Sequence, residues 1–280
     1  VFPESISYIG HQAFDSCDNI SSIKINGNST EIVSFAFHKC LNLTEAEIGN
    51  NVKNIGSSIL ADCNSLEKIT LPRLDALYNN EVGSLFANST PFDYSKIYEG
   101  SSEAYGIPLT LTSVTVLEGT EIPDCAFWYF KSLKEINLPD GITSIGKNAF
   151  NNCSNVKLDI NKLLKNVESI VEYAFSNCSA TEFGDIVLPE KLKKIESGTF
   201  YNCTGITGVY FYKNMESVGS SAFHGCNSIE KVQYEGTDEE WDEFEKSIER
   251  DNDPILRKDI LTCNADAPAV KNTPFAKGDT

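Results

Sequence analysis

A phenylalanine followed three residues later by a cysteine recurs along most of the chain, and this spacing constrains the fold more than any other feature. The pairs are Phe14/Cys17, Phe37/Cys40, Phe150/Cys153, Phe175/Cys178, Phe200/Cys203 and Phe223/Cys226. Leu60/Cys63 fits with Leu in place of Phe, while Phe86 and Phe127 fit without the Cys. Successive anchors lie 23, 23, 26, 41, 23, 25, 25 and 23 residues apart. This is the period of a leucine-rich repeat, so the spacing predicts a solenoid of about nine rungs.

Each repeat has the same internal order of residues. An aliphatic pair and a glycine precede the anchor, as in Ile142, Ile145 and Gly146. An L-x-x-I-x-L segment follows the cysteine position, and its last three residues alternate inward, outward and inward as in a half-buried strand. We therefore expect an α/β repeat solenoid, a right-handed curved rod with a parallel β-sheet on one face. Nine rungs at about 4.8 Å each predict a length of roughly 40–45 Å.

The repeat pattern I-x-x-I-G-x-x-A-F-x-x-C-x-x-L-x-x-I-x-L-P resembles the BspA-like leucine-rich repeats. The segment from Gly146 to Cys153 matches that pattern almost letter for letter, and the resemblance covers roughly residues 1–235. It implies a parallel-stranded solenoid from a secreted or cell-surface protein of gut or oral bacteria, or sometimes of mucosal protists. It also implies a role in adhesion and host contact, although a fold family does not by itself determine function.

The regular spacing breaks between Phe86 and Phe127, where the chain has 18 residues more than the common 23. The additional residues lie near 87–108 and include Tyr94, Tyr98 and Tyr105. Inserts in repeat proteins form loops, and exposed aromatic side chains suit recognition, so one interpretation is a binding loop. The alternative is a longer repeat variant whose tyrosines pack on the flank of the solenoid.

The repeat pattern ends after Tyr234, and a helix pattern follows. Thr237 and Glu240 have the spacing of a helix capping box, and Trp241, Phe244 and Ile248 fall on one face of the helix that would follow. A solenoid needs such a lid because its open end exposes the core. We expect a helical cap over residues 236–264, with a final strand within Ile255 to Cys263, and a tail or linker over 265–280.

Seven of the nine cysteines stand three residues after an anchor, which places them in one column. Their side chains would then lie parallel and would not point at one another, so we expect buried reduced thiols that act as small hydrophobic groups. Zinc is not expected, because no C-x-x-C pair or histidine cluster accompanies them. His38 and His224 follow their anchors at a variable position, so both are expected to be exposed.

No catalytic constellation can be assembled from the sequence. His38 and His224 lie in turns far apart, and His11 stands three residues before its anchor and faces another direction. The carboxylates are scattered, and no phosphate-binding or dinucleotide-binding motif is present. We therefore expect neither an enzyme nor a bound cofactor or metal.

Charge limits the possible partners. Lys and Arg number 23 against 40 Asp and Glu, which gives a net charge of −17. Nucleic acid and anionic membranes both require clustered basic residues, so neither is an expected partner. No stretch approaches the roughly 18 apolar residues of a membrane span. The chain opens at Val1 in a repeat-like segment, so we expect a piece of a longer protein. Extracellular or cell-surface localisation then requires that the signal peptide and the anchor lie outside this piece.

Two function classes follow: a module that binds a host or matrix protein, or a glycan, through its sheet face, and a passive spacer in a larger surface protein. The outward strand residues would be Lys24, Glu47, Thr70, Thr115, Asn137, Asp159, Val187, Tyr210 and Gln233. These are mixed in charge and do not indicate one partner chemistry. The candidate binding surface consists of Thr70, Tyr94, Tyr98, Tyr105, Thr115, Asn137 and Tyr210.

Overall fold

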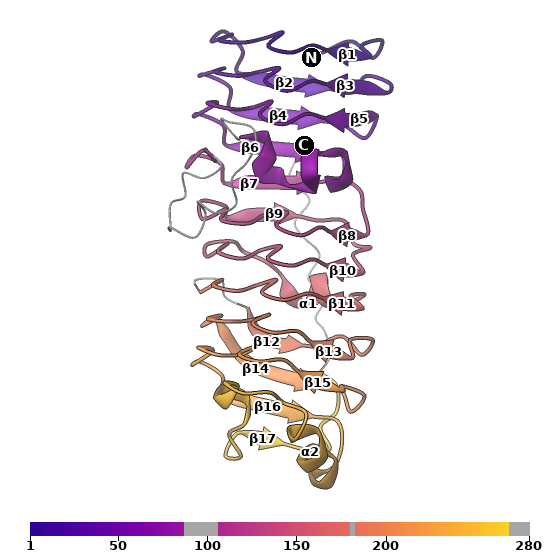
Figure 1. Ribbon diagram of the computed structural model, residues 1–280, viewed down its shortest axis with the longest axis vertical. Helices are drawn as coiled ribbons and strands as arrows, with labels where there is room; N and C mark the ends of the chain where they lie inside the picture. Colours follow the sequence, from indigo (N-terminus) through magenta and orange to yellow (C-terminus); the bar gives the residue numbers. More distant parts are fainter. Residues whose placement is uncertain (87–105, 180–182, 269–280) are drawn as a thin grey trace.

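The computed structural model describes residues 1–86, 106–179 and 183–268, which form a rod of stacked turns (Figure 1). Each turn lies on the one before it, from β1 at the N-terminal end to β17 at the other. The strand pairs of the described residues are parallel. The expected parallel-strand solenoid of about nine turns is confirmed. It is mostly sheet, and its described α-helices are α1 (Ile160–Leu164) and α2 (Asp238–Glu245).

The longer strand of each turn forms one of two sheets. The major sheet contains β2 (Ser22–Ile25), β4 (Glu45–Ile48), β6 (Lys68–Leu71), β7 (Ser113–Val116) and β9 (Glu135–Asn137), in that order. The C-terminal sheet contains β12 (Gly184–Val187), β14 (Ile206–Phe211), β16 (Lys231–Tyr234) and β17 (Leu261–Thr262). In β2, Ile23 and Ile25 are buried whereas Ser22 and Lys24 are exposed. This is the alternation that a strand covering a core on one face requires.

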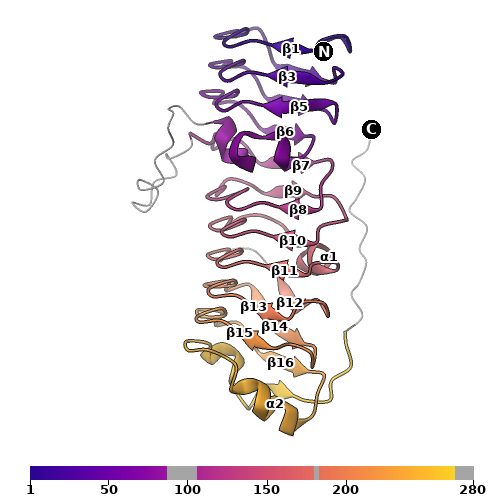
Figure 2. The same cartoon turned by 45° about the vertical axis from the view of Figure 1, so that its right-hand side comes forward.

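The aliphatic pair before each anchor forms a second, shorter strand. These strands pair in three minor sheets: β1 (Tyr8–Ile9), β3 (Thr30–Ile32) and β5 (Val52–Ile55); β8 (Glu121–Ile122), β10 (Ser144–Ile145) and β11 (Ser169–Ile170); β13 (Lys194–Ile195) and β15 (Ser217–Val218). Most turns therefore have two strands, and the anchor segment connects the shorter strand to the longer strand that follows it in the chain. Figure 2 shows the regular superposition of the turns from a second side.

The anchor phenylalanines form two stacks inside the rod, one of Phe14 with Phe37 and one that runs from Phe127 to Phe223. The stacked pairs, with ring centroids 5.2–5.4 Å apart and rings within 20° of parallel, are Phe14–Phe37, Phe127–Phe150, Phe150–Phe175, Phe175–Phe200 and Phe200–Phe223. Because neighbouring strands are about 4.8 Å apart, these distances correspond to slightly offset stacking, which aromatic rings prefer to an exact overlay. The spacing of the repeat thus stacks aromatic rings wherever successive turns carry phenylalanine at the anchor.

The cysteines also form a column, and the column has a hydrogen-bonding role. Each Sγ–H donates to the carbonyl oxygen of an earlier anchor 2.9–3.2 Å away, and these bonds are Cys40–Phe14, Cys63–Phe37, Cys153–Phe127, Cys178–Phe150, Cys203–Phe175 and Cys226–Phe200. Six members of the column are buried, as expected, and Cys17 in the first turn is partly exposed. Cysteine suits this position because it is small and apolar and still supplies a donor to a buried carbonyl.

Two positions in the anchor turns have left-handed backbone, with φ between 54° and 77°. Two residues before the anchor stand Gln12, Phe35, Ser58, Cys125, Asn148, Tyr173, Gly198 and Ser221. Two residues after it stand Ser16, Lys39, Asp62, Tyr129, Asn152, Asn177, Asn202 and Gly225. Asn, Asp and Gly dominate the second column because they tolerate this conformation best. Bulky residues there are exceptions that need an explanation.

Two turns depart from the regular pattern. Before Phe86 the chain forms three short 3-10 helices, Leu74–Ala76, Tyr78–Asn80 and Val82–Leu85. Between β9 and β12, Lys157 forms only an isolated bridge with Glu135, and α1 follows. The prediction that Asp159 is an outward strand residue was wrong, because its side chain caps α1 by accepting from the Lys162 N–H at 3.0 Å. The helix interrupts the sheet because Ile160, Leu163 and Leu164 recur with helical spacing and are buried.

The C-terminal cap begins as expected. The Thr237 side chain accepts from the Glu240 N–H at 3.3 Å, and the Glu240 carboxylate accepts from the Thr237 N–H at 2.9 Å, which completes the capping box. Trp241 and Phe244 are buried, but α2 ends at Glu245, so Ile248 lies beyond it and forms a bridge with Val218. The final strand that we expected exists as β17, which pairs with β16.

Asn252 joins the cap to the last regular turn. In the preceding turn the Phe200 N–H donates to the Ala222 carbonyl at 2.8 Å. Phe223 donates its N–H to the Oδ1 atom of Asn252 at 3.0 Å instead. The Asn252 Nδ2 atom donates to the carbonyl of Gly219 at 3.0 Å and to that of Glu249 at 2.8 Å. The buried amide therefore replaces the backbone of a further turn and ends the ladder without leaving buried polar groups unpaired.

Candidate functional site

Five outward side chains of the major sheet form one row across adjacent strands. The strand register pairs Lys24 with Glu47, Glu47 with Thr70, Thr70 with Thr115 and Thr115 with Asn137. We call these five residues the central row. Neighbouring members lie opposite one another on strands about 4.8 Å apart. The structure therefore brings together three candidates that the sequence left separate in the chain, namely Thr70, Thr115 and Asn137.

The central row is polar and largely satisfied by its own members. Lys24 Nζ forms an ion pair with Glu47 at 2.7 Å, and the Asn137 amide donates to the Thr115 hydroxyl at 3.3 Å. A parallel outward row consists of Ser22, Glu45, Lys68, Ser113 and Glu135. Both rows mix charges with short polar groups, so the face can form hydrogen bonds and ion pairs over a flat area. Such a surface suits a protein partner better than a small apolar ligand.

Tyr210 does not belong to an exposed surface. It is 1% exposed, and its hydroxyl donates to the Ala265 carbonyl at 3.1 Å. Ala265 is held in turn, because its N–H donates to the Tyr234 carbonyl at 3.0 Å. The expectation that Tyr210 is an outward contact residue was wrong, because the segment after β17 covers this part of the C-terminal sheet. Tyr94, Tyr98 and Tyr105 lie outside the described residues.

The C-terminal sheet has a charged cluster that the sequence did not reveal. Lys231 and Asp185 form an ion pair, and the Thr207 hydroxyl donates to Asp185 at 2.8 Å. Lys231 holds the pKa of Asp185 below its ordinary value. The strand between them contributes Gly208, where a Cβ atom would stand 2.7 Å from the Asp185 carboxylate. The missing side chain thus lets the ion pair cross the intervening strand. The signal is hard to find in sequence, since the partners are 46 residues apart.

His38 lies between two carboxylates. Its Nδ1 atom is 2.5 Å from Asp15, and its Nε2 atom is 3.3 Å from Asp62. The hydrogen bond from His38 lowers the pKa of Asp15. The expectation of an exposed His38 was wrong, because its side chain is only 16% exposed between the neighbouring turns. His224 is exposed, and its ring stacks on Tyr201 with centroids 5.1 Å apart.

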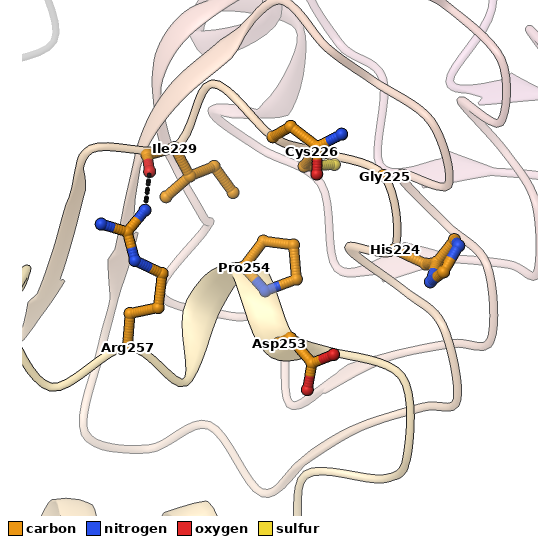
Figure 3. A pocket seen from close by; sticks show the side chains of 8 residues that line it. His224, Gly225, Cys226, Ile229, Asp253, Pro254 and Arg257 are labelled. Atoms are coloured by element: carbon orange, nitrogen blue, oxygen red, sulfur yellow. Dashed lines mark hydrogen bonds between the residues drawn. The ribbon is translucent and has the colours of Figure 1, made fainter.

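A pocket of about 440 Å³ lies between the last regular turn and the cap (Figure 3). His224, Cys226 and Asp253 are among its lining residues, a combination that could suggest a nucleophilic site. However, Cys226 is buried, its Sγ–H donates to Phe200, and burial raises its pKa to about 12. The thiol therefore stays protonated at neutral pH and is a poor nucleophile.

Arg257 is also committed to the cap in this pocket. Its Nη1 atom donates to the Ile229 carbonyl at 3.3 Å, and its Nη2 atom forms an ion pair with Asp259 at 3.0 Å. Figure 3 shows Arg257 and His224 on opposite sides of Pro254, so these two side chains do not converge on one point. We interpret this pocket as the joint between solenoid and cap.

The described residues contain neither a metal site nor a membrane-spanning helix. Within residues 1–86, 106–179 and 183–268, no group of three or more His, Cys, Asp or Glu side chains could hold a metal ion. In the same part of the chain, no helix combines the length and the apolar character that crossing a membrane demands.

Comparison with known proteins identifies the repeat. The family model described as BspA type leucine rich repeat region matches residues 1–100 and 109–244 in six copies. The chain belongs to the BspA-type leucine-rich-repeat family. The match covers the turns from the first anchor to α2, including the major sheet. No curated protein matches this member of the family.

Solved structures of bacterial leucine-rich-repeat proteins are also similar to the chain. A leucine-rich repeat protein from Bacteroides ovatus has 23% identity and a TM-score of 0.43, with 81% of this chain and 58% of that chain covered. A leucine rich cell surface protein from Faecalibacterium prausnitzii has 20% identity and a TM-score of 0.40, with coverage of 83% and 73%. The leucine-rich repeat protein of T. pallidum has 18% identity and a TM-score of 0.39, with coverage of 74% and 76%. The chain thus spans little more than half of the Bacteroides ovatus protein.

Proposed function

We propose that this chain is a non-catalytic binding module of a secreted or cell-surface protein, and that it contacts a host or matrix protein through the major sheet. The central row is the observation that carries the proposal. Five strands in register present ion-paired and hydrogen-bonding side chains on one face, and the buried inward residues of the same strands hold them in place. Membership of the BspA-type family supports the extracellular setting.

The state of the most deeply buried thiols favours binding over catalysis. Burial raises the pKa of Cys178 and of Cys226 to about 12, so these thiols are not available for chemistry at neutral pH. The column instead uses its S–H groups as donors within the fold. What varies from turn to turn is the outward side chain of each strand, which is where a repeat scaffold normally carries its recognition residues.

The proposal is tested by measuring binding of this chain to a panel of purified extracellular-matrix proteins by surface plasmon resonance. We expect at least one partner to bind, and we expect Thr115→Arg to weaken that binding at least tenfold. Thr115 lies on β7, between β6 and β9, where a long side chain would hold the partner away. A tenfold loss corresponds to about 1.4 kcal/mol.

The matched control is Ser144→Arg in β10. Ser144 is likewise an outward, half-buried strand residue, but it belongs to a minor sheet. This variant should bind like the unmodified chain, and both variants should keep the unmodified circular dichroism spectrum. If no matrix protein binds, the chain acts as a spacer. If Ser144→Arg is the variant that loses binding, the contact lies on the minor sheets.

A further inference from the structure

A second surface, on the anchor turns, forms an open groove of about 550 Å³ that the sheet-face contact does not use. Its lining residues come from consecutive anchor turns, and they are Trp128, Tyr129, Lys147, Asn148, Asn151, Asn152, Tyr173, Ser176, Asn177 and Tyr201. We call it the turn-face groove. Four of these side chains are aromatic and four are primary amides. From the turn of Tyr129 to that of Tyr201 the chain advances three turns, or about 14 Å.

Two of the aromatic residues occupy left-handed backbone positions. Tyr129 has φ of 66° and Tyr173 has φ of 59°, at positions where the next turns carry asparagine, glycine or serine. A bulky side chain costs free energy in this conformation, and such local strain tends to persist where it serves a function. Phe35 is the other aromatic residue in these columns, and its ring packs between those of His11 and His38. The two tyrosines, in contrast, both line the groove.

The tyrosine rings are held in fixed places. The ring of Tyr173 lies over Gly198, where an added Cβ atom would stand 2.3 Å from the ring. Tyr201 stacks on His224 with an angle of 16° between the rings. Tyr129 packs beside Trp128 with centroids 5.4 Å apart, and Lys131 Nζ lies 5.2 Å from the centre of its ring. These contacts restrain ring faces before any ligand arrives, which lowers the entropic cost of binding.

Amide groups connect the aromatic walls of the groove. Asn151 donates to the Asn148 side chain at 2.8 Å, and Asn152 donates to Asn151 at 2.6 Å. Each side-chain amide has two N–H donors and a carbonyl oxygen with two lone pairs, so this chain of bonds leaves donors and acceptors over. Trp128 is 9% exposed, and its buried Nε1–H has no acceptor among the described residues.

The charge and the side-chain types of the groove indicate which class of ligand it could bind. Its single cation, Lys147, is already paired with Glu172 at 2.8 Å, so the lining offers no free charge to an ionic ligand. The lining includes no aliphatic side chain of the kind that receives the apolar anchors of a peptide. Ring faces pack on the C–H faces of sugar rings, while amides exchange hydrogen bonds with hydroxyl groups. We propose that the turn-face groove binds a short neutral oligosaccharide.

The test uses the whole chain and an array of neutral tetrasaccharides of glucose, N-acetylglucosamine and mannose, with heparin as the anionic comparison. We expect at least one neutral tetrasaccharide to bind. The triple variant Tyr129→Asn, Tyr173→Asn and Tyr201→Asn should weaken that binding at least tenfold, as measured by isothermal titration calorimetry. Each change introduces a residue that another turn carries at the same position. Asn152 follows Tyr129 by one turn, Asn148 precedes Tyr173 by one turn, and Asn151 precedes Tyr201 by two turns, so the fold should be kept.

Two further variants complete the experiment. Tyr201→Asn alone supplies the test if the triple variant is less stable. Tyr8→Asn is the control, because Tyr8 is a 59% exposed tyrosine in the first turn, and it should bind normally.

Several results would overturn the inference. These are silence of the array toward every neutral tetrasaccharide, binding of heparin alone, and unchanged affinity of the triple variant. A peptide or protein that binds the groove and is lost in the triple variant, without any sugar binding, would also contradict it. Thr115→Arg should leave sugar binding intact, so the failure of this site and the failure of the sheet-face contact are separate outcomes.

Discussion

Replacing Phe175 with alanine should lower the free energy of unfolding by about 3–5 kcal/mol. Phe175 is fully buried, and its ring stacks between Phe150, 5.3 Å away, and Phe200, 5.4 Å away. The truncation removes ring contacts to both neighbouring turns at once. The stack is close-packed and continuous, so the surrounding turns cannot collapse into the space without shifting the ladder.

Urea denaturation followed by circular dichroism measures this loss. Tyr8→Ala serves as the control, because Tyr8 is exposed and its replacement should change the free energy of unfolding by less than about 0.5 kcal/mol. A second readout is the reactivity of Cys178 and Cys203 toward a thiol reagent, since both column members lie in this region and are buried. A Phe175→Ala protein as stable as the unmodified chain would show that the aromatic stack does not support the rod.

Ending the chain at Gln233 should have an equally large effect. The deletion removes Trp241, which is 2% exposed and contacts the rings of Phe211 and Tyr234 with centroids 6.1 and 5.4 Å away. Loss of one buried tryptophan side chain costs about 3–5 kcal/mol. The last turn would also expose its core edge, so we expect self-association on size-exclusion chromatography together with a lower melting temperature.

Asn252→Leu tests the same joint with a single change. The leucine would leave the Phe223 N–H and the carbonyl of Gly219 without their partners, and each unpaired buried group costs roughly 1–3 kcal/mol. Asn227→Leu is the matched control, because Asn227 is an exposed asparagine in the turn of Phe223. Equal melting temperatures for both variants, or a monodisperse truncated chain of normal stability, would show that the cap is only an appendage.

The parts of this fold that depend on short-range signals could be predicted from the sequence. The repeated spacing of Phe and Cys determines the turns, because these residues occupy equivalent buried positions in successive turns. Thr237 and Glu240 determine the start of α2, because a capping box involves residues three apart. The break in spacing between Phe86 and Phe127 coincides with an irregular turn, although its three tyrosine candidates stay predictions.

The failures concern contacts between residues far apart in the chain. Tyr210 has the strand position of an exposed residue, and it is covered because Ala265, 55 residues later, reaches it. Asp159 stands where a strand residue was expected, and the helical spacing of the apolar residues after it overrides the repeat. Asn252 carries no sequence signal for its role, since a buried side chain that imitates a backbone turn depends wholly on its surroundings.

The turn-face groove could have been found in the sequence. Aligning the turns on their anchors shows Asn152, Asn177 and Asn202 in one column, and asparagine in a repeated turn position indicates left-handed backbone. A tyrosine in that column, as at position 129, then stands out as a costly choice. However, only the three-dimensional arrangement of the turns shows that three tyrosines line one groove.

Differential lysine acetylation tests most directly whether the major sheet is the contact surface. Lys24 and Lys68 are exposed on the major sheet, and Lys53 and Lys194 are equally exposed on minor sheets. Labelling is compared by mass spectrometry for the free chain and for the chain saturated with a matrix protein from the binding panel. We predict slower acetylation of Lys24 and Lys68 and an unchanged rate at Lys53 and Lys194. Protection of Lys53 and Lys194 with none at Lys24 and Lys68 would contradict the proposed binding face.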